Sequence, residues 1–201
     1  MASIPVSTNN LERWALMELA KKRNARKESK GIKSQKVDPG ITDVQLHYVG
    51  LKAEYAVAKL IGVEIDLENT YEGDGGIDIN YRGLTIDVKL STRDLKHRLD
   101  KKVVADVIVL VQPLMQTTSS GAYHAKAIPD PMVDKKVFAW NNVMVIGWIS
   151  REEFLSTCSV ANFGHFDCNV VTANNMRDMS TLRAYAASKH RTRMYDEIFT
   201  E

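Results

Sequence analysis

The chain has 201 residues, which is enough for one domain with a hydrophobic core. Hydrophobic residues make up 44% of the chain and charged residues 26%, a composition typical of soluble globular proteins. No apolar run approaches the roughly 20 residues of a membrane-spanning helix, and the polar N-terminus lacks the apolar segment of a secretory signal. The two cysteines, Cys158 and Cys168, indicate neither a disulfide framework nor a zinc site, so we expect a reducing, cytoplasmic location.

A strongly basic segment near the N-terminus stands out against the formal net charge of +2. Residues 21–36 contain eight lysines and arginines and a single acid, Glu28. Such a block can bind phosphate groups even when the whole chain is nearly neutral, and Lys22, Arg23 and Arg26 are candidates for nucleic-acid contacts. A solvated basic helix face is the alternative that this pattern leaves open.

Two helices are predicted in the first third of the chain. The first covers Leu11 to about Lys30, where apolar residues recur at helical spacing. Residues 31–40 read as a linker, because a Pro-Gly pair breaks the chain there. The second helix begins at Thr42 or Asp43, either of which can cap it, and ends at Ile61 before Gly62.

Strands are predicted over much of the chain beyond Gly62. Residues 77–91 largely alternate between apolar and polar side chains around a turn at Arg82-Gly83, which indicates a hairpin. Residues 63–66 fit a short strand or a connector. Further strands are expected over residues 103–111, where an almost continuous apolar run indicates burial on both faces, and over residues 123–128 and 143–149. Helices are expected after a capping box formed by Ser150 and Glu153, and over residues 178–199.

This order of elements predicts an α/β fold with a mixed central sheet flanked by helices. We expect a basic N-terminal helix and linker in residues 1–40 and a core domain in residues 41–160. Residues 161–201 are expected to form a helical tail packed on the core.

The segment with the clearest chemistry is the second strand of the hairpin. Because side chains alternate along a strand, Asp87, Lys89 and Ser91 point to the face opposite Ile86. Asp78 comes close to Asp87 if the strands pair through the predicted turn. Two convergent carboxylates repel each other unless a cation lies between them. Ligation by oxygen alone favours Mg²⁺ or Mn²⁺.

Such an ion lowers the pKa of a bound water and neutralises charge that develops on a phosphodiester, and Lys89 adds a positive charge beside the same phosphate. An exposed hairpin face with an ordinary salt bridge is the alternative. The five histidines show no ligand spacing, so a zinc nuclease is not predicted. Asp106, in the predicted central strand, is expected to make a structural hydrogen bond.

Gly75-Gly76-Ile77-Asp78, followed nine residues after the aspartate by Asp87-x-Lys89, resembles the PD-(D/E)xK, or restriction-endonuclease-like, nuclease superfamily. The resemblance covers roughly residues 42–155, and the segment around Gly147-Trp148 is similar to a late strand and helix of phage-borne members. It implies a restriction-endonuclease-like core, a Mg²⁺-dependent endonuclease that hydrolyses DNA, and host-cell cytoplasm as the location if the source is a phage. Ile77 stands where the superfamily motif has proline.

The resemblance also implies roles for particular residues. Asp78 and Asp87 would be the acids that bind metal, Lys89 the catalytic lysine, and the carbonyl of Val88 a further ligand. Glu54, on the helix before the hairpin, would be a fourth catalytic residue and metal ligand.

Further contacts with nucleic acid are expected around this site. Gly76 lets backbone approach the metal or the substrate, and Ser91 continues the face of Lys89. The basic stretch of residues 93–102 reads as a mobile loop along a nucleic-acid backbone, with Arg93, Lys96 and Arg98 as candidates. A nuclease fold that binds DNA or a protein partner with little turnover is the alternative function, and a homodimer is compatible with either.

Overall fold

The computed structural model describes residues 3–31, 41–65, 76–114, 116–117, 123–124, 132, 142–164 and 166–199. Its helices are α1 (Asn10–Ser29), α2 (Asp43–Ile61), α3 (Arg151–Thr157) and α4 (Leu182–Phe199), with 3-10 turns at Ala173–Asn175 and Met179–Thr181. Its strands are β1 (Ile4–Ser7), β2 (Ile79–Tyr81), β3 (Leu84–Leu90), β4 (Leu95–Arg98), β5 (Val107–Pro113), β6 (Gln116–Thr117), β7 (Tyr123–His124), β8 (Asn142–Ser150), β9 (Ser159–Asn162) and β10 (Asp167–Val171).

The central sheet has five strands in the order β1-β8-β5-β3-β2. Strands β3 and β5 run parallel, and the other neighbours are antiparallel, so the sheet is mixed as predicted. Strand β5 lies in the middle with residues 107–111 fully buried, which confirms the central strand. It begins at Val107 rather than Val103. The Asp106 carboxylate just before it accepts hydrogen bonds from the amide and hydroxyl of Thr85, the structural role expected for this residue.

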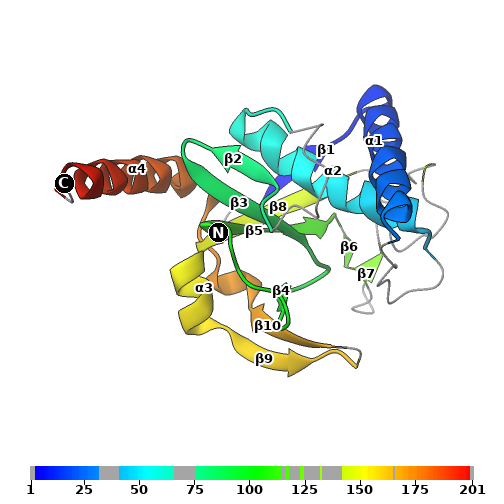
Figure 1. Cartoon of the computed structure of the whole chain (residues 1–201). Coiled ribbons are helices and arrows are strands. Elements are labelled where there is room, and N and C mark those ends of the chain that lie inside the picture. The colour runs from blue at the N-terminus through cyan, green and yellow to red at the C-terminus, as the bar shows by residue number, and fades with distance from the viewer. Residues whose placement is uncertain are drawn as a thin grey trace.

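A second sheet, in the order β4-β10-β9, packs on one side of the central sheet, and α2 covers the other side (Figure 1). Strand β4 corrects the prediction of a mobile basic loop after β3. Its backbone pairs with β10, and Leu95 and His97 turn inward while Lys96 and Arg98 turn outward. The alternation of two inward and two outward side chains is that of a strand, although half of the residues are basic.

Two apolar clusters sit on the two faces of the central sheet. One joins α1 and α2 to side chains that include Ile86, Val88 and Trp148. The other joins Ile108 and Leu110 of β5 to side chains from the second sheet and α3. The faces of β3 are therefore distinct: the Ile86 face is apolar and packs under α2, and the Asp87 face looks toward the second sheet.

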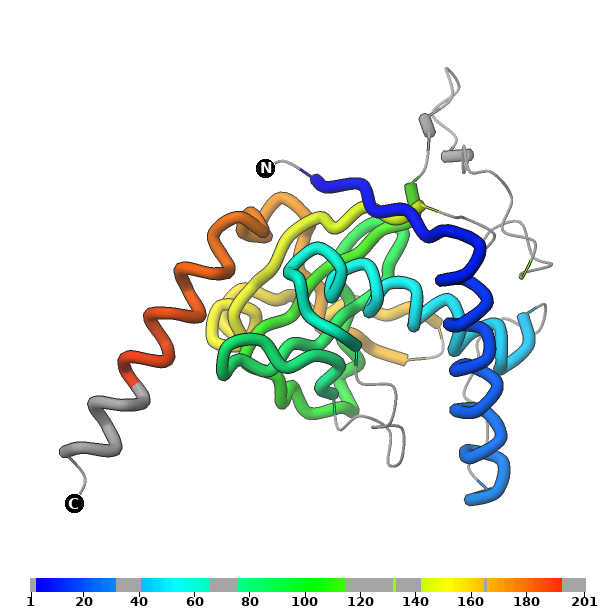
Figure 2. The backbone as a smooth tube through the Cα atoms, turned by 90° about the horizontal axis from the view of Figure 1, so that it is seen from above, coloured from blue at the N-terminus to red at the C-terminus, as the bar shows by residue number. Residues whose placement is uncertain are grey.

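The first helix belongs to this core. Helix α1 packs across α2 with Leu16, Leu19 and Ala20 buried, and β1 pairs with β8 at the sheet edge (Figure 2). The division of the chain at residues 40 and 160 stays a prediction, although residues on both sides of each boundary contribute to the sheets and the core.

Capping residues set the helix ends close to where the sequence indicated. Thr42 caps α2 in a capping box with Gln45, and Gly62 ends it in the left-handed conformation. Ser150 and Glu153 form the expected capping box of α3. In the hairpin turn, Arg82 and Gly83 both have positive φ, as a two-residue turn of type I′ requires. Among the helices that the structure describes, none combines the length and apolar character needed to cross a bilayer.

Some predicted features lie outside the described residues: the linker over residues 32–40, Asp66, Gly75, and residues 125–128 of a predicted strand. Residues 63–65 form a connector, and the predicted C-terminal helix begins at Leu182 rather than residue 178.

Substitutions in α1 test whether this helix is part of the folding unit. Leu16 is 3% exposed and Leu11, on the same helix, is 74% exposed. Leu16→Ala should lower the free energy of unfolding by about 2–5 kcal/mol, because it removes buried methyl groups and leaves a cavity. Leu11→Ala makes the same chemical change at the surface and should cost no more than about 0.5 kcal/mol. Urea denaturation of both variants measures the difference, and equal losses would show that α1 does not pack as described.

Candidate functional site

Strand β3 presents its polar side chains on the face that looks toward the second sheet. Asp87 lies beside Ile108 of β5, and Lys89 lies beside Leu110, in a parallel register. Both neighbours belong to the apolar cluster on that face. Asp87 and Lys89 therefore share one face of β3, as the alternation of side chains predicts. The β5 side chains beside them on that face are apolar.

Asp87 is a buried carboxylate held by a lysine. It is 2% exposed, and its Oδ1 accepts a hydrogen bond from Lys89 Nζ at 2.5 Å. The Lys89 side chain is 33% exposed, so its ammonium group joins the buried carboxylate to solvent. A carboxylate taken out of water this completely is stable only with a positive or hydrogen-bonding partner, and Lys89 supplies one.

Asp78, the residue just before β2, lies against the same part of β3. Its backbone amide donates to the carbonyl of Ile86 at 2.8 Å, which continues the pairing of the hairpin. Its Oδ2 accepts a hydrogen bond from the amide of Val88 at 2.6 Å. The Asp78 carboxylate thus lies against the peptide group that joins Asp87 to Val88.

The backbone of Val88 adds an acceptor at this edge. In a β-strand the N–H and C=O of one residue point to the same side, and the N–H of Val88 points toward Asp78. The Val88 carbonyl therefore faces the edge where β2 has ended. Two carboxylates and a carbonyl oxygen are brought to one stretch of β3.

His97 is a site residue that the sequence did not reveal. It lies on β4, is 5% exposed, and places its Nε2 3.9 Å from Asp87 Oδ2. Its Nδ1 is 3.1 Å from the carbonyl of Arg98, and its ring meets Phe154 edge-on with centroids 6.0 Å apart. The histidine is 10 residues from Asp87 and shows no ligand spacing, so only the strand alternation of residues 95–98 could have indicated that it turns inward.

The surroundings of His97 favour its neutral form. Burial lowers the pKa of this imidazole, and the nearby ammonium group of Lys89 lowers it further. The Arg98 carbonyl and the Asp87 carboxylate act in the opposite direction but do not reverse the shift.

Glu54 lies in an ion pair between two helices. Both of its carboxylate oxygens accept from Arg23 of α1 at 3.1 Å. Helix α2, which carries Glu54, covers the face of the sheet opposite Asp87. The structure thus joins Glu54 to α1, and a part for it in metal binding stays a prediction.

The basic residues predicted to contact nucleic acid lie on α1, on the segment between β3 and β4, and on β4. On α1, Lys22 is exposed, Arg26 is half-buried and Arg23 is held by Glu54. After β3, Arg93 is highly exposed and pairs with Asp94.

On β4, the outward side chains stack on aromatic rings. Lys96 Nζ lies 4.0 Å from the ring centre of Phe163, and the Arg98 guanidinium lies 5.0 Å from that of Phe166 and pairs with Asp100. These stacked cations form the outer face of the second sheet, on the side away from Asp87.

Ser91 and Gly76 are two further residues that the sequence predicts to contact nucleic acid. The amide of Ser91 donates to the carbonyl of Val111 at 3.0 Å, so β3 stays attached to β5 at its end. Gly76 has a φ of 86° with open space where a Cβ would lie, so the glycine is needed for its backbone conformation rather than for close packing.

Within the residues that the structure describes, no group of three or more histidine, cysteine, aspartate or glutamate side chains is placed to hold a metal ion. A metal at β3 would therefore take ligands from fewer side chains, from backbone carbonyl and from water or substrate. That is the usual condition of Mg²⁺ in proteins, which keeps several waters and binds one or two carboxylates.

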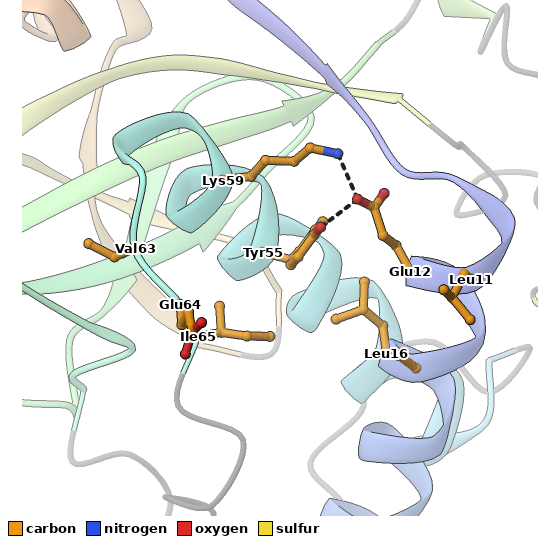
Figure 3. Close-up of a pocket in the computed structure, with 9 residues that line it drawn as sticks. Leu11, Glu12, Leu16, Tyr55, Lys59, Val63, Glu64 and Ile65 are labelled. Atoms are coloured by element: carbon orange, nitrogen blue, oxygen red, sulfur yellow. Dashed lines mark hydrogen bonds and ion pairs between the residues drawn. The ribbon is translucent and has the colours of Figure 1, made fainter.

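A groove of about 560 Å³ lies elsewhere, between α1, α2 and residues 63–65, and contains none of the predicted catalytic residues (Figure 3). In it, Glu12 accepts from the hydroxyl of Tyr55 at 2.5 Å and from Lys59 Nζ at 2.8 Å. Burial and the hydrogen bond to Glu12 raise the pKa of Tyr55 to about 12. These contacts fasten the start of α1 to α2.

Comparison of the chain with protein-family models, with curated proteins and with solved structures finds no match.

The charges around His97 can be tested by its titration. Lys89→Met should raise the pKa of His97, because it removes a positive charge that disfavours the imidazolium, and Asp87→Asn should lower it for the opposite reason. An NMR titration of the imidazole Cε1 proton measures both shifts. Lys101→Met, at an exposed position, is the control and should leave the pKa unchanged. An unchanged pKa in Lys89→Met would contradict the geometry described.

Proposed function

We propose that this protein is a metal-dependent nuclease that hydrolyses phosphodiester bonds in DNA, with Asp78, Asp87 and Lys89 as its catalytic residues. The observation that carries the proposal is the buried Asp87–Lys89 pair, together with the Asp78 carboxylate against the next peptide group.

The position of this pair supports a functional role over a structural one. Replacing a buried ion pair by apolar side chains of similar size is often neutral or stabilising, so such a pair is weak evidence of a stability requirement. Here it sits on a face where Ile108 and Leu110 already pack with the second sheet. A catalytic role therefore explains better than a structural role why a carboxylate and an ammonium group occupy this position.

We also propose a restriction-endonuclease-like core. The support is the arrangement of the motif: helix α2 precedes the hairpin, the hairpin carries Asp78 at one strand and Asp87-x-Lys89 on the other, and β5 follows in parallel next to β3. A sheet of this kind brings the first acid to the strand that carries the other two residues.

The donors at β3 fit a divalent ion with a preference for oxygen. The Asp78 and Asp87 carboxylates and the Val88 carbonyl are hard oxygen ligands, as Mg²⁺ and Mn²⁺ require. When bound, such an ion would activate water and neutralise charge on the phosphate. These three groups would bind the ion, and the proposed ligands do not require Glu54.

Lys89 and the apolar side chains around Asp87 would provide the rest of the transition-state stabilisation. The Lys89 ammonium is held by Asp87, and the side chain that carries it is one-third exposed, so we expect it to contact a phosphate oxygen of the substrate. A positive charge held in place before the reaction stabilises the negative charge of the transition state without reorganisation. The apolar layer behind Asp87 keeps water from its inner side and strengthens these interactions.

Basic residues that reach the surface would hold the DNA backbone. Arg93 is exposed three residues after Leu90, the last residue of β3, and Lys22 and Arg26 lie on the basic helix α1. Contacts to phosphate carry affinity rather than sequence preference and weaken with salt. We therefore expect DNA binding to fall steeply as the salt concentration rises.

Cleavage assays with substituted protein test the proposal. Plasmid, linear duplex, single-stranded and branched DNA are incubated with Mg²⁺ or Mn²⁺, with EDTA as the blank. Asp87→Asn and Lys89→Met should each lower the single-turnover rate at least about 100-fold, because each removes a charge that acts in the transition state. Circular dichroism checks that both variants fold.

Asp167→Asn, an exposed aspartate of β10, is the matched control and should cut at the rate of the unsubstituted protein. Undiminished cleavage by a folded Asp87→Asn protein would overturn the assignment. Binding of DNA without cleavage in either metal would favour the alternative, a module that uses this fold to bind DNA or a protein partner.

A further inference from the structure

The side chain of His97, from the second sheet, lies at the candidate site. His97 turns inward from β4 and is the group that faces Asp87 Oδ2, on the side of the carboxylate away from Lys89. The 3.9 Å between His97 Nε2 and Asp87 Oδ2 is longer than a hydrogen bond but short enough for one small ion to contact both atoms.

The hydrogen bond on the other side of the ring decides which nitrogen is available. The carbonyl of Arg98 can only accept, so Nδ1 of His97 carries a proton and donates it. The neutral ring then has its lone pair on Nε2, which points at a carboxylate oxygen. Two acceptors that face each other in a buried place call for a cation or a donor between them.

Histidines that bind metals in proteins show the same arrangement. One ring nitrogen donates to a backbone carbonyl or a carboxylate, which fixes the ring and its tautomer, and the other nitrogen binds the metal. In His97 the Arg98 carbonyl supplies the first contact, and Phe154 and the burial of the ring restrict its rotation.

We propose that His97 Nε2 and Asp87 Oδ2 bind the same divalent ion, so that the metal of this site has a nitrogen ligand and first-row transition ions bind better than Mg²⁺. This inference rests on the proposed function and concerns the same site. It adds the His97 nitrogen to the oxygen ligands proposed at β3, and water or substrate phosphate would complete the ligands.

A histidine that only fills space between β4 and α3 would have the same burial. It would give no reason for the free nitrogen to point at Asp87, and it would not change the preference for metals.

Pulsed electron paramagnetic resonance of the Mn²⁺-loaded full chain tests the nitrogen ligand directly. Protein with ¹⁴N-histidine should show nuclear modulation from a coordinated nitrogen, and the modulation should change when all histidines carry ¹⁵N. This comparison needs no substitution and therefore does not depend on a variant that folds. Bound Mn²⁺ without any histidine nitrogen signal would overturn the inference and leave the proposed function standing.

Substitutions then assign the nitrogen to a residue and measure its effect. By calorimetric titration, the affinity should rise in the order Mg²⁺, Mn²⁺, Co²⁺, because nitrogen ligands favour the later ions. His97→Gln should lower the Co²⁺ affinity roughly tenfold or more and the Mg²⁺ affinity much less. His47→Gln, a histidine on α2, is the matched control and should leave the order unchanged.

Equal losses for all three ions in His97→Gln would show that His97 only positions Asp87, which contradicts the inference. Asp87→Asn separates this result from a failure of the proposed function. If Asp87→Asn binds all three ions like the unsubstituted protein, the metal site is elsewhere and both proposals fail.

Discussion

The structure around the candidate site depends on one constraint, which is that the buried carboxylate of Asp87 must be compensated. Asp87 is 2% exposed, and it lies where the central sheet and the second sheet meet. Lys89 compensates it from the same strand, and His97 faces it from the other sheet. The second sheet helps to bury this carboxylate and places His97 beside it, so the fold of the second sheet and the surroundings of Asp87 are linked.

The alternation of β3 makes this arrangement possible without loss of the core. Ile86 and Val88 pack under α2, and Asp87 and Lys89 use the other face of the same seven-residue strand. The short β2 ends next to Asp87, which leaves the amide of Val88 to the Asp78 side chain instead of to a strand neighbour. The Asp78 carboxylate thus reaches the peptide group that joins Asp87 to Val88.

The sequence was sufficient for features that depend on local rules. Thr42 and Gly62 limit α2, Arg82-Gly83 turns the hairpin, and the period of two places Asp87 and Lys89 on one face, because each of these follows from backbone geometry or capping. Strands β1 and β4 were missed because they are four residues long and partly polar or basic. They are stabilised by pairing with β8 and β10, which are distant in the sequence.

The side chains that come together across elements were harder to predict. Nothing in the sequence connects His97 to Asp87, since their contact depends on how two sheets pack. Glu54 was expected at the metal only because the resemblance implies an acid on this helix. The Arg23 partner that α1 provides could not be anticipated without the packing of α1 on α2. Long-range packing, rather than the motif, decides what each of these groups touches.

The most direct test of a metal site at β3 is a crystal structure of the protein grown in Mn²⁺, with anomalous diffraction measured for manganese. We expect an anomalous peak about 2.0–2.3 Å from a carboxylate oxygen of Asp87, with the Asp78 carboxylate facing the same ion. A protein saturated with Mn²⁺ that shows no peak at Asp87, and in which Lys89 alone still compensates this carboxylate, would contradict the proposed site.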